Sequence, residues 1–340
     1  MFTLYIYANI LHMDNILTLH GANPENLYRA FNITMPDKII DFSINTNILS
    51  WPSININLEE LASHYPDPDC NSLRRLISER ENISPERILF TNGINEAIYL
   101  LSQSLSGTTA ILQPCYSEYK RAFRTSHDAF RLDDAGHFDN FILTNPNNPT
   151  GKYIPDLSRI IMRYPDTMFI VDEAYIDFLI HDSVREKLCE FRNVILLRSL
   201  TKFFHLSGVR IGYVIADENL ISELKAIQPT WSVNSIAQEL AERFLNDETF
   251  YADTQKFYRK NTPAFIDSLR ASGFHVMNSD VHYFLIQVDD DISMIRHLLM
   301  NGIAVRHTRN FAGLNGRYIR VVTRQPDENE IFVRVLKYQS

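Results

Sequence analysis

The sequence predicts an α/β fold built on a mostly parallel sheet, with a smaller α+β portion after it. Three observations predict it. Between residues 87 and 202, short β-type runs alternate with stretches of helical periodicity, as in strands joined by crossover helices. Beyond Pro229, two helical stretches precede short strands, which is typical of a separate α+β portion. The length of 340 residues also suits two domains of ordinary size.

The predicted elements follow one another in a regular order. A turn-rich opening at 20–24 leads to a short alternating strand at 39–43, and helical spacing of apolar residues predicts a helix over 73–80. The strands of the main series are predicted at 87–91, 109–113, 140–144, 167–172 and 193–198. Helices are predicted at 94–105 and from Ser117 in this series, and at 235–245 and 257–271 after it. Strands near 282–288 and 318–323 complete the chain.

These elements place a domain boundary near residue 230. Residues 1–52 are predicted to form an N-terminal arm and part of a small domain, 53–230 the large domain, and 231–340 the C-terminal small domain. The first thirteen residues are apolar but lack the basic region and cleavage site of a signal peptide, and they are too short to span a bilayer. Either Met13 is an alternative start, or the stretch is a strand or arm that packs on a partner.

Composition and charge narrow the class of function. Hydrophobic residues make up 45% and charged residues 22% of the chain, which excludes disordered and low-complexity classes. A net charge of -8 without a Lys/Arg cluster excludes nucleic acid or an anionic membrane as the main partner and favours a small molecule. The three cysteines are too few and too scattered for a disulfide framework or a zinc site, which predicts a reducing, cytoplasmic compartment and no metal.

Polar residues follow two of the early strands, where an open parallel sheet binds its ligands. Thr91–Glu96 follows one strand and opens a helix, so the backbone N–H groups of Gly93, Ile94 and Asn95 can hold a phosphate; a plain N-capped turn is the alternative. In Asn145–Gly151, two prolines fix an extended backbone that presents the Asn148 amide in one direction. The alternative there is a surface turn.

Two later strands end in ionisable groups. Asp172 lies at the tip of a strand that is otherwise apolar, where a carboxylate needs a partner. A protonated ring nitrogen would supply one, while a helix N-cap or a magnesium ligand are the alternatives. Lys202 ends the segment Arg198–Lys202, with Arg210 eight residues on, which suits imine chemistry beside a phosphate; a surface lysine is the alternative.

A phosphate cradle, an Asp for a pyridinium nitrogen, an Asn for a ring oxygen and a Lys for an imine are what pyridoxal phosphate (PLP) requires. Because they occur in this order, each at a strand end, the chain resembles the fold-type I PLP enzymes, the aspartate aminotransferase superfamily, over nearly its whole length. The resemblance implies PLP as cofactor and the PLP-dependent transferase fold. That fold has a mostly parallel seven-stranded sheet in its large domain and a smaller α+β domain.

The resemblance also implies a role for each motif residue. Lys202 forms the imine with the cofactor, Asp172 pairs with the pyridine nitrogen, and Asn148 and Tyr175 bind the ring 3-oxygen. The residues implied to hold the cofactor phosphate are Gly93, Ile94, Asn95, Ser199 and Arg210. Tyr116 is implied to stack on the ring, although a core role is the alternative. Tyr65 is implied to reach the phosphate of the other subunit, which means a homodimer with a shared active site.

Within the superfamily, the chain resembles the threonine-phosphate decarboxylases of cobalamin biosynthesis, with the histidinol-phosphate aminotransferases as nearest cousins. The segments that carry this are His20–Gly21 with Asp41–Asn45, Arg198–Phe203, and Arg306–Arg320. They imply that Arg320 binds the substrate carboxylate and that Arg306, with His20 and Asn45, binds the substrate phosphate. Arg324 stands where the aminotransferases usually carry glycine, and this favours decarboxylation.

The expected reaction is therefore decarboxylation of an O-phospho-L-amino acid. Phosphothreonine would give 1-amino-2-propanol phosphate and phosphoserine would give ethanolamine phosphate, either of which is a linker for a cobamide nucleotide loop. Departures from the decarboxylase pattern leave this choice open; they are Ala22, Thr46, Cys115 and Leu206–Ser207. One alternative is a histidinol-phosphate-type aminotransferase. Another is a non-catalytic regulator, and the presence of Lys202 and Asp172 argues against the regulator.

Overall fold

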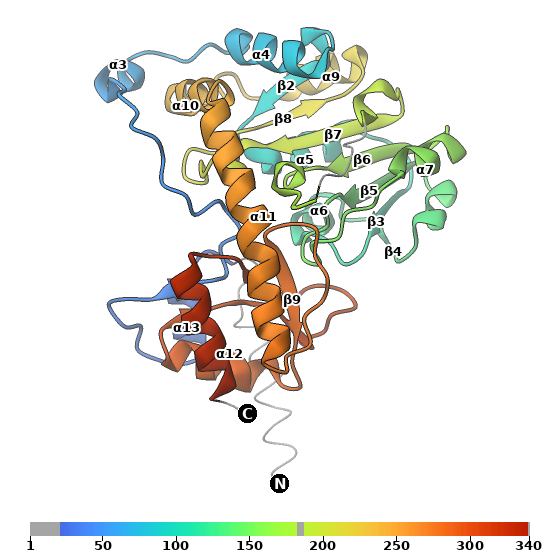
Figure 1. Cartoon of the computed structure of the whole chain (residues 1–340). Helices are drawn as coiled ribbons and strands as arrows, with labels where there is room; N and C mark the ends of the chain where they lie inside the picture. Colours follow the sequence, from blue (N-terminus) through green and yellow to red (C-terminus); the bar gives the residue numbers. More distant parts are fainter. Residues whose placement is uncertain (1–20, 182–186, 339–340) are drawn as a thin grey trace. The chain divides into compact units, whose positions relative to one another are not determined.

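The computed structural model describes residues 21–181 and 187–338 and confirms the predicted α/β fold (Figure 1). Its contacts divide the chain into two compact units. Unit 1 contains the described residues up to Asn45, the short segment Pro149–Gly151, and the chain from Lys260 onward. Unit 2 contains Thr46–Asn148 and Lys152–Arg259.

Unit 2 is built on a seven-stranded sheet of order β2-β8-β7-β6-β5-β3-β4. Its strands are β2 (Ile88–Thr91), β3 (Thr109–Leu112), β4 (His127–Ala129), β5 (Asn140–Thr144), β6 (Met168–Asp172), β7 (Val194–Ser199) and β8 (Gly212–Ile215). All neighbouring strands are parallel except β8, which is antiparallel to both β2 and β7. The sheet is therefore mostly parallel, as the sequence predicts.

The central strands are buried on both faces, because helices cover the sheet. Every residue of β5 is buried, and so are the residues of β6 after Met168, which explains their continuous apolar runs. The helix α5 packs Ala97, Ile98 and Leu101 into the same cluster as the sheet residues Ile142 and Ile170. The α-helices of unit 2 are α3 (Leu58–Ser63), α4 (Asn71–Glu81), α5 (Gly93–Ser104), α6 (Ser117–Ala122), α7 (Leu157–Arg163), α8 (Leu200–Phe203), α9 (Glu218–Ile227) and α10 (Ser235–Leu245). Short 3-10 helices lie at η1 (Pro85–Arg87), η2 (Leu132–His137), η3 (Ile176–Phe178) and η4 (Leu188–Glu190).

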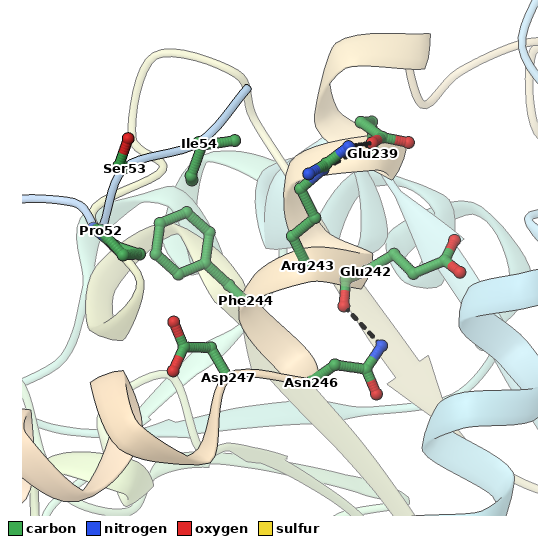
Figure 2. A pocket seen from close by; sticks show the side chains of 9 residues that line it. All are labelled: Pro52, Ser53, Ile54, Glu239, Glu242, Arg243, Phe244, Asn246 and Asp247. Carbon is green, nitrogen blue, oxygen red and sulfur yellow. Dashed lines mark hydrogen bonds and ion pairs between the residues drawn. The ribbon is translucent and has the colours of Figure 1, made fainter. Parts of the chain in front are cut away.

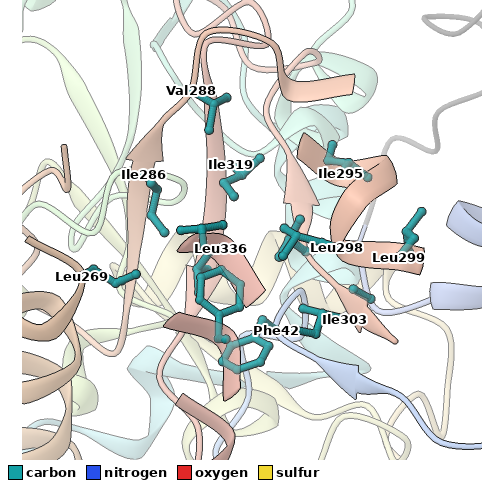
Figure 3. Close-up of a cluster of buried hydrophobic side chains, with 14 of the residues drawn as sticks. Phe42, Leu269, Ile286, Val288, Ile295, Leu298, Leu299, Ile303, Ile319 and Leu336 are labelled. Carbon is teal, nitrogen blue, oxygen red and sulfur yellow. The ribbon is translucent and has the colours of Figure 1, made fainter. Parts of the chain in front are cut away.

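Unit 1 is the predicted α+β portion. It pairs β1 (Ile40–Asp41) in parallel with β10 (Ile303–Ala304), and it carries an antiparallel sheet of order β11-β12-β9. The strands of that sheet are β9 (Tyr283–Gln287), β11 (Arg306–His307) and β12 (Tyr318–Val322). Its helices are α2 (Pro24–Ala30), α12 (Asp291–Met300) and α13 (Pro326–Lys337). Figure 3 shows how Phe42, Leu298 and Leu336 meet in the core of this unit, where the Phe42 and Phe332 ring centroids lie 4.7 Å apart.

The unit boundaries differ from the predicted domain boundaries. The chain changes unit within α11 (Glu248–Ala271), after Arg259, rather than near residue 230. The reason is that α10 buries Ala237, Leu240 and Phe244 and belongs wholly to unit 2. The turn signals at 229–231 mark a loop between two helices of one unit, so composition alone did not locate the boundary.

The structure also bears on membranes. Among the described residues, none of the helices combines the length and the apolar character that crossing a membrane requires.

Candidate active site

The residues predicted to hold the cofactor meet at one edge of the unit 2 sheet. The strands β2, β3, β5, β6 and β7 all end at this edge, and β8 begins there because it runs the opposite way. The predicted residues that lie at the ends of these strands or shortly after them are Gly93, Ile94, Asn95, Tyr116, Asn148, Asp172, Tyr175, Ser199 and Lys202. Arg210 reaches the same edge just before β8. Because β8 is antiparallel, Arg210, which comes just before it, lies at this edge. In a parallel strand that residue would lie at the opposite edge.

An anion cradle forms where α5 begins. The first N–H groups of a helix have no partner within the helix, and they lie at the positive end of its dipole. Gly93, the first residue of α5, has a φ of 71°, and a Cβ there would lie 2.8 Å from an Arg210 guanidinium nitrogen. The missing side chain therefore lets the guanidinium sit against the helix start, while its other terminal nitrogen donates to the Ser207 carbonyl oxygen at 3.0 Å. This donor set fits a phosphate ester.

Asp172 ends β6 with only 4% of its surface exposed. Its Oδ1 accepts a hydrogen bond from the Ala174 N–H at 2.9 Å, and its Oδ2 accepts one from the Tyr119 hydroxyl at 2.9 Å. Burial nevertheless raises the pKa of Asp172 to about 6, while these two hydrogen bonds and the charge of Lys202 act in the opposite direction. A nearby cation would stabilise the ionised carboxylate, so the site fits a protonated ring nitrogen.

The loop after β5 is tied down on both sides of Asn148. Asn145 donates to the Ile154 carbonyl oxygen at 3.1 Å and accepts from the Ile154 N–H at 2.8 Å. The Asn147 amide donates to the Pro114 carbonyl oxygen and to Thr144 Oγ1, both at 2.9 Å. The Asn148 N–H donates to Thr144 Oγ1 at 3.3 Å, so hydrogen bonds hold the backbone around this residue, which is 8% exposed. Tyr175 is also buried, just ahead of η3.

Lys202 lies in α8, a single short helix whose backbone is held from outside. The Lys202 carbonyl oxygen accepts the Asn47 N–H at 2.9 Å, and the Asn47 amide donates to the Phe203 carbonyl oxygen at 3.0 Å. Thr201 Oγ1 donates to the Ile211 carbonyl oxygen at 3.1 Å. Sequence reasoning did not single out Asn47, although it is fully buried; an Asn two residues after Asn45 was the available signal.

The two tyrosines predicted to contact the cofactor differ in their surroundings. Tyr116 is partly buried, and its hydroxyl lies 3.3 Å from Asn95 Oδ1, beside the start of α5. Tyr65 is 80% exposed, and its ring stacks on Trp231 with centroids 4.4 Å apart. Tyr116 is therefore tied to the anion cradle, whereas most of the Tyr65 surface remains available for contact.

Unit 1 holds two of the predicted substrate residues as a buried pair. Arg306 and Arg320 are direct cross-strand partners in β11 and β12 and are 3% and 4% exposed. Burial, and then the charge of Arg320, lower the pKa of Arg306 to about 9. Arg306 donates to Asn310 Oδ1 at 2.7 Å, and Arg320 donates to the Ser43 carbonyl oxygen at 2.9 Å. Two buried guanidinium groups at adjacent positions repel each other, and an anion beside them would relieve this repulsion.

The other predicted substrate residues have different environments. Arg324 binds Glu328 through two donors at 3.0 Å each and the Asp41 carbonyl oxygen through a third, also at 3.0 Å. Asn45 is buried, and its carbonyl oxygen accepts from His282 Nε2 at 3.2 Å. His20 lies outside the described residues.

Two surface cavities of unit 2 are lined by other residues. One of about 480 Å³ is bounded by Pro52, Ile54 and Phe244, and Figure 2 shows the Glu239–Arg243 ion pair at its side. Another of about 530 Å³ is lined by Arg198 and Tyr251, among others. In the part of the chain that the structure describes, no group of three or more His, Cys, Asp or Glu side chains is placed to hold a metal ion.

Curated relatives match the chain over most of its length. It is 30% identical to the threonine-phosphate decarboxylase of Salmonella typhimurium, over 94% of this chain and 95% of that protein. It is 28% identical to the histidinol-phosphate aminotransferase of Methanococcus aeolicus, over 93% and 94% of the two chains. It is also 30% identical to the adenosylcobalamin biosynthesis bifunctional protein of Leptospira interrogans, and it spans only 40% of the length of that relative.

Solved structures have the same fold. The histidinol-phosphate aminotransferase from Clostridium acetobutylicum matches with a TM-score of 0.82 and 26% identity, over 88% of this chain and 99% of that one. The L-threonine-O-3-phosphate decarboxylase from Porphyromonas gingivalis matches with a TM-score of 0.77 and 26% identity over the same shares. The histidinol-phosphate aminotransferase from Sinorhizobium meliloti, solved in complex with pyridoxal-5'-phosphate, matches in fold with a TM-score of 0.81 and 20% identity, over 96% and 97% of the two chains.

The family match covers the residues at the sheet edge. The model of aminotransferase classes I and II matches residues 55–336, which include the anion cradle, Asp172 and Lys202. The chain belongs to the class I and II aminotransferase family, with the fold-type I architecture and pyridoxal phosphate as its cofactor.

Proposed function

We propose that this chain catalyses the PLP-dependent decarboxylation of an O-phospho-L-amino acid. The observation that carries the proposal is the buried pair Arg306 and Arg320 in unit 1. Such a substrate has two anionic groups, a carboxylate and a phosphate, and two guanidinium groups complement them. When bound, PLP supplies an electron sink for the bond that breaks at the substrate Cα.

In this proposal, unit 2 binds the cofactor. The start of α5 and Arg210 hold its phosphate, together with Ser199, which is 6% exposed and lies opposite Gly212 in the β7–β8 register. Asp172 keeps the ring nitrogen protonated, and Asn148 and Tyr175 bind the ring 3-oxygen. Lys202 anchors the cofactor and returns a proton to the substrate Cα.

Unit 1 recognises the anionic groups of the substrate. Arg320 binds the carboxylate, and Arg306 binds the phosphate with help from Asn45 and His20. Arg324 is proposed as a third contact, but its donors already bind Glu328 and the Asp41 carbonyl oxygen. Its contribution to substrate binding therefore requires the exchange of one of these hydrogen bonds.

The name of the Salmonella relative supports phosphothreonine as the amino acid. The product would then be 1-amino-2-propanol phosphate, and phosphoserine would give ethanolamine phosphate, the linker of a norcobamide. One methyl group separates the two substrates, a difference worth about 1 to 3 kcal/mol in an apolar pocket. Either product would serve as the linker of a cobamide nucleotide loop.

Product analysis tests the proposal. The PLP-loaded enzyme is incubated separately with phosphothreonine, with phosphoserine, and with histidinol phosphate plus a ketoacid. Release of carbon dioxide without a ketoacid is the expected result, and the faster amino acid identifies the substrate. Arg306→Leu should raise KM for the phosphorylated amino acids, whereas Arg296→Leu, a matched change at an exposed arginine of unit 1, should not. An equal rise in KM in both variants would refute the role of Arg306.

Amino transfer is the second candidate reaction, supported by the 28% identity to the histidinol-phosphate aminotransferase of Methanococcus aeolicus. Both reactions would start from the same bound substrate, and they differ in which bond at Cα breaks: loss of the carboxylate gives the amine, and loss of the α-proton leads to amino transfer. Ketoacid-dependent transfer from histidinol phosphate, without carbon dioxide, would establish this alternative.

A homodimer and a cytoplasmic location complete the proposal. Tyr65 and Trp231 form an exposed aromatic pair, 80% and 47% exposed, that a second copy of the chain would cover while placing Tyr65 near its cofactor phosphate. Three free, buried cysteines suit a reducing compartment. Light scattering of the purified chain tests the dimer, because a monomer that is fully active would contradict a shared site.

A further inference from the structure

The Asp172 carboxylate is held by a residue that the cofactor assignment does not include. Tyr119 lies in α6, and its hydroxyl oxygen is 2.9 Å from Asp172 Oδ2. The other carboxylate oxygen takes the Ala174 N–H at 2.9 Å. Since the two donors come from different elements and reach different oxygens, they fix the plane of the carboxylate. A carboxylate with one of these bonds would be able to turn about its Cβ–Cγ bond.

The direction of the Tyr119 hydrogen bond follows from its burial. Tyr119 is fully buried, and burial together with the charge of Asp172 raises the pKa of its hydroxyl well above the ordinary value. The hydroxyl therefore keeps its proton. Because an ionised carboxylate only accepts hydrogen bonds, Tyr119 donates to it, and a charge-assisted bond in a buried site is among the stronger kinds.

The other ionisable groups around Asp172 do not replace this donor. Burial and the charge of Asp172 raise the pKa of the Cys115 thiol, which stays neutral. Glu173 forms an ion pair with Arg198 at 2.5 Å, and it disfavours the charge on Asp172. Lys202 favours that charge, but its amine is the group that would bind the cofactor. The neutral hydroxyl of Tyr119 remains a donor whatever the state of the lysine.

We propose that Tyr119 is a positioning residue of the cofactor site, whose hydroxyl orients the Asp172 carboxylate and supports its ionised form, so that the PLP ring nitrogen stays protonated. The proposal rests on the proposed role of Asp172 as partner of that nitrogen. It concerns cofactor binding and ring protonation, and it therefore holds for decarboxylation and for amino transfer alike.

Tyr119→Phe tests the proposal because it removes only the hydroxyl. The ring packs in a buried cluster and lies edge-on to Tyr116 with centroids 6.4 Å apart, contacts that phenylalanine retains. Tyr28→Phe is the matched control, since Tyr28 is also buried and its hydroxyl donates to the Leu299 carbonyl oxygen within unit 1. Two readouts do not require turnover: the Kd for PLP by fluorescence titration, and the protonation state of nitrogen-15-labelled PLP by NMR across pH.

Loss of a hydrogen bond to a charged group predicts that Tyr119→Phe weakens PLP binding by about tenfold to a hundredfold. The ring nitrogen should also lose its proton at a lower pH than in the wild type, and Tyr28→Phe should leave that titration unchanged. A Tyr119→Phe variant with the wild-type Kd and titration would overturn the proposal. If the Phe variant does not fold, p-aminophenylalanine at position 119, which carries an N–H donor where the hydroxyl lies, is expected to retain a protonated ring, and a deprotonated ring would count against the proposal.

Asp172→Asn separates the two levels of inference. If it deprotonates the ring while Tyr119→Phe does not, Tyr119 has no positioning role and the assignment of Asp172 stands. If Asp172→Asn leaves the ring protonated, the proposed role of Asp172 fails, and the role of Tyr119 fails with it.

Discussion

At the scale of single residues, the burial of Asp172 makes its ionised form unfavourable for folding, although the proposed cofactor contact requires that form. The pKa of Asp172 is raised to about 6 in the cofactor-free chain, chiefly by burial, from an ordinary value of 3.8. Between these values the folded chain binds more protons than the unfolded chain, so the contribution of Asp172 to stability falls as pH rises from about 4 to about 6. Asp172 therefore contributes least to the stability of the folded chain when its carboxylate is ionised. This ionised form is the one that would pair with a protonated ring nitrogen.

This linkage gives a prediction for the cofactor-free protein. The difference between a pKa of about 6 and one of 3.8 corresponds to about 3 kcal/mol. Asp172→Asn carries no charge, so the variant should exceed the wild type in free energy of unfolding by up to about 3 kcal/mol at pH 7, and the gap should close near pH 4. Urea unfolding of the two cofactor-free proteins at several pH values measures it. A variant less stable than the wild type at pH 7 would show that the ionised carboxylate stabilises the fold.

At the scale of elements, an ion pair joins the ends of two strands, β6 and β7, that lead to the proposed catalytic groups. Arg198 of β7 and Glu173, next to Asp172 at the end of β6, are 2.5 Å apart and 5% and 3% exposed. The Glu173 N–H also donates to the Leu197 carbonyl oxygen at 2.8 Å. The contact therefore ties the end of β6, with Asp172, to the end of β7, with Ser199 and the start of α8.

Breaking this pair should cost far more than breaking a surface pair. Arg198→Leu removes a buried guanidinium that pairs with Glu173 and lies 3.6 Å from a Glu81 carboxylate oxygen, and we expect a loss of about 3 to 5 kcal/mol in the free energy of unfolding. Arg243→Leu is the matched control, because Arg243 and Glu239 pair on the surface with side chains 45% and 32% exposed, and it should cost less than about 1 kcal/mol. Equal midpoints of urea unfolding for the two variants would contradict a structural role for the buried pair.

The same scale shows what sequence could predict. The strand ends with Gly93, Asn148 and Asp172 were predicted because each motif is local, and strand, turn and helix signals stand side by side. The antiparallel strand β8 was not predicted, because four buried residues in a row fit either a strand or a helix and do not indicate the direction of a strand within the sheet. Likewise, the pairing of Arg306 with Arg320 depends on the β11–β12 register, which the spacing of the two residues does not determine.

At the scale of the whole molecule, the two units divide the proposed work. Unit 2 carries the groups that we propose hold the cofactor, and unit 1 carries the buried arginines. The chain has a net charge of -8, so its overall charge does not attract phosphorylated substrates. Recognition of an anion must therefore come from local groups that are held apart from the acidic surface, as Arg306 and Arg320 are by their burial.

This division predicts that variants in the two units fail differently. In the presence of excess PLP, which occupies the cradle at α5, inorganic phosphate should stabilise the wild type by about 2.7 kcal/mol at a concentration a hundred times its Kd. Lys202→Ala should abolish turnover and keep this stabilisation, because its change lies in unit 2. Arg306→Leu should lose the stabilisation while its affinity for PLP stays at the wild-type value. Thermal unfolding with and without phosphate measures the effect, and a response of the same size in both variants would mean that phosphate binds outside the arginine pair.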